Sequence, residues 1–70
     1  MDNQPAFDYH TLVEAELAAR ILGVDPRTLA NWRCLRRGPP YVKIGSLVRY
    51  QMSDIENFIA KHRVKTTDAS

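Results

Sequence analysis

The residues of this 70-residue chain best suited to chemistry are the polar and cationic side chains of residues 26–34. On a helix of 3.6 residues per turn, Arg27 and Asn31 share one side, and the other residues there, Ala30 and Cys34, are small. Arginine can pair with guanine, and asparagine with adenine, through two hydrogen bonds each. Since that side contains no acidic residue, the pattern predicts a helix that can read bases in the DNA major groove.

The residues around this stretch predict how the helix is positioned. Gly23 supplies the permissive backbone that ends a preceding helix. Asp25 is a good N-cap, and Pro26 falls at the first helical position, where its missing N–H costs nothing. Leu29 and Trp32 lie three residues apart, on the opposite side from the polar residues, so we expect both in the core. The alternative for the tryptophan is stacking on single-stranded bases.

Two helices joined by a short turn are predicted before the middle of the chain. Residues 13–22 have apolar side chains at helical spacing, and Glu14 and Glu16 suit the positive end of the helix dipole. The three residues 23–25 lead into a second helix, from Pro26 to about Arg36. A short glycine-containing turn between two helices is typical of a helix-turn-helix.

A β-hairpin is predicted over residues 41–50. Residues 37–40, Arg-Gly-Pro-Pro, end the second helix, and a Gly-Ser turn at 45–46 separates two β-branched and aromatic runs. A two-stranded hairpin is marginal alone and must pack on the helices. Lys43 and Arg49, on opposite strands, are either solubilising charges or cations of a wing that touches phosphate or the minor groove.

A third helix is predicted from a capping box in which Ser53 is the N-cap and Glu56 follows three residues later. It extends to about Lys61 or Arg63. The buried face is expected to comprise Ile55, Phe58 and Ile59.

The charge is concentrated in the middle of the chain. The net charge is only +2, but residues 26–49 carry six basic side chains and no acidic one. Residues 1–25 carry five acids and one base, and residues 50–70 carry three of each. A solvated face is the plainest explanation of such a block, but its coincidence with a helix and a hairpin favours contact with nucleic acid.

The composition argues against several other classes of protein. A single cysteine excludes an internal disulfide, and with only His10 and His62 it forms no familiar zinc set. The chain has no membrane-spanning run, no basic secretory leader, and no nucleophile–base pair or glycine-rich phosphate loop. We therefore expect a cytoplasmic, nucleoid-associated protein without cofactor, metal, small-molecule substrate or enzymatic activity.

The length allows one small domain. Residues 1–10 are predicted to form a flexible N-terminal arm, whose end Phe7 and Tyr9 attach to the core. Residues 11–63 form the domain, and residues 64–70 form a flexible C-terminal tail. The predicted fold class is α+β, a small winged helix-turn-helix with a two-stranded hairpin wing and a C-terminal helix.

Residues 11–59 resemble the small excisionase-like winged-helix proteins, which are related to the DNA-binding head of MerR-type regulators. The resemblance runs through Ala-Ala-Arg-Ile-Leu-Gly-Val at 18–24, Arg-Thr-Leu at 27–29 and Trp-Arg at 32–33. It continues through Gly-Pro-Pro-Tyr-Val-Lys-Ile-Gly at 38–45, Val-Arg-Tyr at 48–50 and Ser-Asp-Ile at 53–55.

The resemblance implies double-stranded DNA as the partner, with the second helix in the major groove and the hairpin at the adjacent minor groove or backbone. Family members include recombination directionality factors, which bind repeated sites cooperatively, bend DNA and contact an integrase, and AlpA-like transcription regulators. The residues expected to bind DNA are Arg27, Thr28, Asn31, Arg33, Arg37, Lys43, Ser46 and Arg49. Arg36 is expected to be structural or to face phosphate. Because Ala30 and Cys34 are small, DNA shape and neighbouring protomers should supplement direct base readout.

An excisionase that promotes integrase-mediated excision of a prophage or mobile element is the predicted function, and a transcription regulator is the alternative. A protein-interaction module on a winged-helix fold is a more distant alternative, for which an apolar patch should replace the cationic face.

Overall fold

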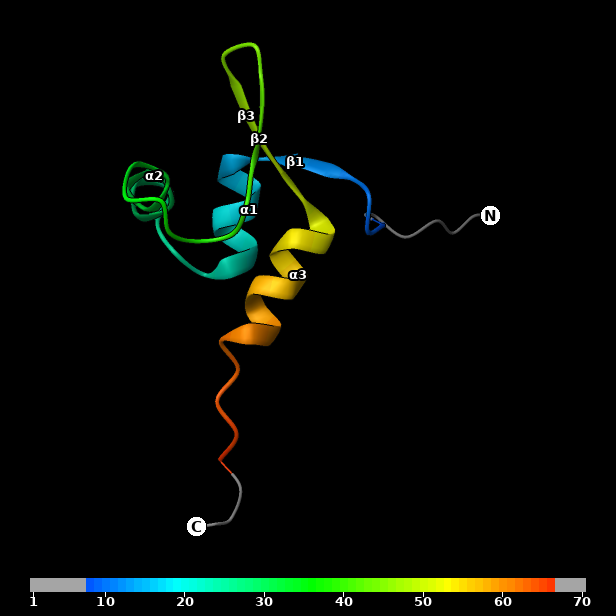
Figure 1. Cartoon of the computed structure of the whole chain (residues 1–70), viewed down its shortest axis with the longest axis vertical. Coiled ribbons are helices and arrows are strands. Elements are labelled where there is room, and N and C mark those ends of the chain that lie inside the picture. Colours follow the sequence, from blue (N-terminus) through cyan, green and yellow to red (C-terminus); the bar gives the residue numbers. More distant parts are fainter. Residues whose placement is uncertain (1–7, 67–70) are drawn as a thin grey trace.

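The computed structural model describes residues 8–66, which form three helices and a three-stranded antiparallel sheet (Figure 1). In chain order the elements are β1 (Leu12–Glu14), α1 (Ala15–Leu22), α2 (Pro26–Cys34), β2 (Val42–Ile44), β3 (Leu47–Gln51) and α3 (Met52–Lys61). This α+β architecture confirms the predicted winged helix-turn-helix. Residues 1–7 and 67–70, which include Phe7 and parts of the predicted arm and tail, lie outside the described residues.

The first element corrects the predicted start of the first helix. Residues 12–14 form β1, which pairs with β3 in the sheet order β1-β3-β2. Val13 lies opposite Tyr50 and is buried in the core, and α1 begins only at Ala15. Helical spacing predicted a longer helix because it takes no account of a partner strand 37 residues further along the chain.

The turn between α1 and α2 forms as the sequence predicts. Gly23 has a left-handed backbone with φ 74° and ends α1. Asp25 caps α2, since its carboxylate accepts a hydrogen bond of 2.8 Å from the Arg27 amide. Pro26 occupies the first helical position. Local chemistry therefore determines the direction in which α2 leaves α1.

The start of α3 differs from the predicted capping box. The N-cap position is Gln51, and Ser53 lies inside the helix and provides no side-chain cap. The amides of Met52 and Ser53 instead donate to the carbonyls of Thr11 and Tyr9, each at 2.9 Å. Backbone from the N-terminal segment thus replaces the predicted side-chain cap.

A turn at residues 8–11 holds that segment in place. The Asp8 carboxylate accepts hydrogen bonds from the His10 amide at 2.9 Å and from the Thr11 hydroxyl at 3.2 Å. The hydrogen bond from the His10 backbone, followed by that from Thr11, lowers the pKa of Asp8. The Tyr9 side chain is exposed, so the backbone of this residue attaches the segment to the domain while its side chain stays outside the core.

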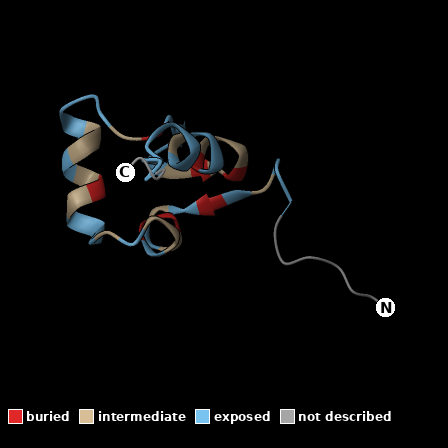
Figure 2. Cartoon of the chain, turned by 90° about the horizontal axis from the view of Figure 1, so that it is seen from below, coloured by how far each residue is buried: buried red, intermediate tan, exposed pale blue. Residues whose placement is uncertain are grey.

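The core lies where β1, β3 and the three helices meet, and the buried positions of α2 face the rest of the domain (Figure 2). Its members are Val13, Ala18, Ala19, Leu29, Tyr50, Met52 and Ile55. Trp32 packs against this cluster, and its ring centroid lies 5.8 Å from that of Phe58. The prediction for Leu29 is confirmed, but Ile59 is 39% exposed, so its predicted burial is wrong.

The hairpin formed by β2 and β3 extends beyond the helices (Figure 1). Residues 45–46 form its turn, as predicted. Only the base of the hairpin packs on the core, through Tyr50 and Val48. Within residues 8–66, no helix is both long enough and apolar enough to cross a membrane.

Candidate nucleic-acid interface

The side of α2 that points away from the core carries the residues expected to read bases. A shallow hollow there is lined by Arg27, Thr28, Ala30, Asn31 and Cys34, which we call the outer face of α2. Only Thr28 and Ala30 among them are partly buried. Because the face is open and contains no acidic side chain, it can approach the polyanionic surface of DNA.

Arg27 stands at the N-terminal end of this face. Its side chain is 93% exposed, and its Nε lies 3.8 Å from the carboxylate of Asp25. Such an exposed ion pair contributes little to stability, so the guanidinium can exchange it for another acceptor. Asp25, which caps α2, therefore also keeps Arg27 near the start of the helix and leaves the guanidinium able to bind another acceptor.

Arg33 lies where α2 meets the hairpin. Its Nη1 donates a hydrogen bond of 2.9 Å to the hydroxyl of Tyr50, which is fully buried. Its guanidinium carbon lies 5.8 Å from the centroid of the Tyr41 ring. The side chain is thus oriented by two tyrosines of the hairpin segment and does not line the hollow with Arg27 and Asn31.

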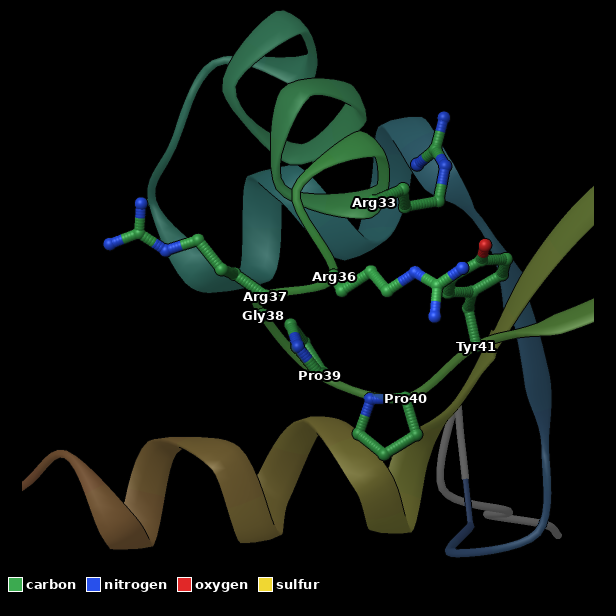
Figure 3. A pocket seen from close by; sticks show the side chains of 7 residues that line it. All are labelled: Arg33, Arg36, Arg37, Gly38, Pro39, Pro40 and Tyr41. Carbon is green, nitrogen blue, oxygen red and sulfur yellow. The ribbon is translucent and has the colours of Figure 1, made fainter.

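A second hollow, of about 510 Å³, opens beside Arg33. Arg33 and Arg36 point toward the side where Tyr41 lies, whereas Arg37 points away (Figure 3). Its remaining lining residues are Gly38, Pro39 and Pro40, and we call the whole the junction hollow. The guanidinium groups of Arg33 and Arg36 on one side of this open concavity (Figure 3) create a positive surface suited to a phosphate group.

The backbone of this segment is shaped by the end of α2. Arg36 has a left-handed φ of 60°, which is uncommon outside glycine, and Gly38 has a φ of 81°. The Arg37 amide donates to the Trp32 carbonyl at 2.7 Å. A Cβ at residue 38 would lie 2.9 Å from Cε3 of Trp32, so glycine is required here for space as well as for conformation. The close turn brings the arginines back toward the hairpin.

The two cations expected on the wing lie on opposite faces of the hairpin. Lys43 is paired with Val48, whereas Arg49 is paired with Val42 one position further along. Since neighbouring strand positions face opposite sides, Lys43 shares the face of Tyr50, toward α2, and Arg49 lies on the other face. The Arg49 guanidinium donates to the Val48 carbonyl at 2.8 Å. Ser46 lies in the exposed hairpin turn.

The structure thus divides the predicted site residues into groups. Arg27, Thr28 and Asn31 lie together on the outer face of α2. Arg33 and Arg37 line the junction hollow. Among the wing residues Lys43, Ser46 and Arg49, the last is separated from the α2 side.

The sequence did not assign Tyr41 and Tyr50 to DNA binding, and it left Arg36 as either structural or facing phosphate. Tyr50 and Tyr41 orient Arg33, and Arg36 adds a second guanidinium on the same side. Arg33 and Tyr50 lie 17 positions apart in the sequence, so no helical or strand spacing relates them. The available signal in the sequence was the position of Arg33, four residues after the core residue Leu29 and therefore on the same side of α2.

Nowhere in residues 8–66 do three histidine, cysteine, aspartate or glutamate side chains come together as metal ligands. The arrangement instead offers guanidinium, amide and hydroxyl groups, which bind phosphate and base edges.

Comparison with known proteins identifies the domain. A search of curated proteins found no significant match. The helix-turn-helix domain family matches residues 15–63, which span all three helices and the hairpin. The chain therefore belongs to the helix-turn-helix domain family, as a small DNA-binding protein.

Proposed function

We propose that the protein binds double-stranded DNA sequence-specifically, with α2 in the major groove and the hairpin at the adjacent minor groove or backbone. The observation that supports this best is the coupling of Arg33 to the buried Tyr50 hydroxyl. This hydrogen bond places a cation between the reading helix and the wing, where a DNA strand would pass from one groove to the next. The outer face of α2 then reads bases, chiefly through Arg27 and Asn31.

We further propose that it acts as an excisionase that binds repeated sites cooperatively, bends DNA and promotes integrase-mediated excision of a mobile element or prophage. The resemblance of residues 11–59 to excisionase-like proteins supports this role. A single domain with few base contacts should bind one site weakly, so specificity requires several copies. Bending costs a few kcal/mol, which phosphate and protomer contacts can offset. The action is non-enzymatic and takes place in the cytoplasm, at the nucleoid.

A gel-shift titration on duplex DNA from the protein's own locus tests DNA binding. Binding should weaken as salt rises, because phosphate contacts release counterions. Arg27→Ala should cost about 1–3 kcal/mol if this side chain pairs with a base. Arg63→Ala, which removes the same charge beyond the end of α3, is the matched control. No shift, or a shift that neither salt nor Arg27→Ala alters, would refute DNA reading by α2.

An excision assay tests the narrower role. The purified protein is added to the neighbouring integrase and a substrate that carries both attachment sites. Excision that requires the protein and is lost with Arg27→Ala supports the directionality factor. If the protein binds DNA and controls a promoter of its locus but leaves excision unchanged, it is a transcription regulator instead.

A further inference from the structure

The face of the sheet that points away from the helices is mostly aliphatic. Strand positions that lie directly opposite each other share a face. Val42, Ile44 and Leu47 lie on the face opposite to the core residue Tyr50, and they are 37%, 50% and 52% exposed. Leu12, on β1, belongs to the same face. None of the described helices covers these residues, which we call the outer sheet face.

The charge of the outer sheet face differs from that of the rest of the hairpin. Its two charged side chains, Glu14 and Arg49, are paired with each other across β1 and β3 and have opposite signs. The side toward α2 carries Arg33, Arg36 and Lys43, which would repel a second copy of the protein. A neutral, aliphatic face is therefore the side on which two copies of this cationic domain can meet.

The surface that best complements the outer sheet face is the outer sheet face of a second copy. The exposed aliphatic residues outside the sheet are isolated from one another: Leu35 follows α2, Ile59 lies on α3 and Val64 lies beyond α3. A head-to-tail contact would need a second apolar surface, and the hollow beside Trp32 and Phe58, which would be the candidate, is bordered by the cationic side chain of Arg37. A two-fold contact needs only one self-complementary patch.

The small area of the outer sheet face limits the conditions under which two copies can associate through it. Stable complexes bury about 800 Å² on each partner, and a few partly exposed aliphatic side chains supply only a fraction of that. The contact is therefore too small to hold dimers at micromolar protein concentration, but DNA that holds two copies side by side raises their effective concentration to roughly the millimolar range, where a small contact can couple them.

We propose that the outer sheet face binds the same face of a second copy of this chain, through a two-fold contact centred on Ile44 and Leu47, when both copies sit on DNA. This inference rests on the proposed DNA-binding function. It specifies the arrangement of sites, because a two-fold axis between the copies requires half-sites in inverted orientation.

The test compares Ile44→Gln with Ile59→Gln on DNA. Both substitutions are neutral and lie at exposed positions, but the second is on α3. The half-site is first defined by footprinting the wild-type protein on its own locus, and duplexes then carry one half-site, two inverted ones or two direct ones. Ile44→Gln should lower the coupling between two inverted sites about tenfold, while the affinity for one site stays within about twofold. Ile59→Gln should leave both quantities unchanged.

Three results would overturn the proposal. Unchanged coupling in Ile44→Gln would remove the face from the contact. Stronger coupling on direct than on inverted sites would contradict the two-fold arrangement. An equal loss at one and at two sites would mean that Ile44 contacts DNA, for example as an apolar wedge in the minor groove.

A measurement without DNA separates this contact from the proposed function. Amide NMR spectra are recorded from micromolar to millimolar protein concentration. Concentration-dependent shifts at residues 42–49, absent in Ile44→Gln, would support the contact even if the protein failed to bind DNA. Shifts at residues 42–49 that persist in Ile44→Gln, shifts confined to other residues, or the absence of any shift, would each contradict it.

Discussion

Replacing Tyr50 by phenylalanine should separate the orientation of Arg33 from the presence of its charge. The substitution removes the hydroxyl that accepts the hydrogen bond from Arg33 and keeps the ring in the core. A hydrogen bond to a charged group contributes about 1.5–3 kcal/mol when its loss leaves a buried group unpaired. Arg33 is only half-buried and can regain water, so we expect a loss of about 1 kcal/mol in the free energy of unfolding, which is below that range.

Tyr50→Phe should weaken DNA binding more than a substitution that is equally destabilising but lies far from the interface. Immobilising a long side chain costs about 0.5–1.5 kcal/mol, a cost that the Tyr50 hydroxyl removes by holding Arg33 in place before DNA arrives. The dissociation constant for one site should therefore rise about two- to tenfold in Tyr50→Phe. Arg33→Ala should weaken binding further and reduce the slope of log affinity against log salt by about 1.

Fluorescence anisotropy at several salt concentrations measures these affinities, and urea unfolding measures stability. Tyr9→Phe, which removes a hydroxyl from an exposed side chain, is the control and should change neither. In the Arg33→Ala background, Tyr50→Phe should have no additional effect on DNA affinity. If the two losses simply add, or if Tyr50→Phe lowers stability and leaves affinity unchanged, then the hydroxyl does not prepare Arg33 for DNA and the reasoning fails.

Two further predictions concern folding and can be measured by chemical or thermal denaturation. Gly38→Ala should lower the free energy of unfolding by more than the roughly 1–2 kcal/mol of an alanine in the left-handed conformation, because the added Cβ would also collide with Trp32. Gly45→Ala is the control: its Cβ would enter open space, so only the left-handed conformation should cost stability. Equal losses in the two variants would contradict the close contact between residue 38 and Trp32. Asp25→Ala should lower the free energy of unfolding by about 1 kcal/mol because α2 loses its side-chain cap, whereas Ser53→Ala should lower it by less than about 0.5 kcal/mol. A larger loss for Ser53→Ala would show that Ser53 caps α3 after all.

Features that depend on neighbouring residues were predictable from the sequence. The turn from α1 into α2 follows from Gly23, Asp25 and Pro26, whose backbone and capping preferences act within a few residues. The hairpin turn at 45–46 and the core position of Leu29 follow from equally local patterns. The overall α+β winged helix-turn-helix fold could therefore be predicted from the sequence.

Features that depend on distant pairing were not predictable. Helical spacing predicts a helix that begins at residue 13, and only the pairing with β3 makes residues 12–14 a strand. The capping box at Ser53 was chemically reasonable, but the carbonyls of Tyr9 and Thr11 reach the α3 amides first. Local rules supply candidates for each backbone group, and the tertiary fold selects among the competing partners.

The candidate site shows the same division. Sequence alone determined that a cationic helix and a cationic hairpin follow each other, and that Arg27 and Asn31 share a helix face. Only the tertiary structure decided that Arg33 turns toward Tyr50, and that Lys43 and Arg49 lie on opposite faces of the hairpin. The physical reason is that helical spacing is set within one turn, whereas strand register and the packing of α2 on the hairpin depend on contacts between residues far apart in the chain.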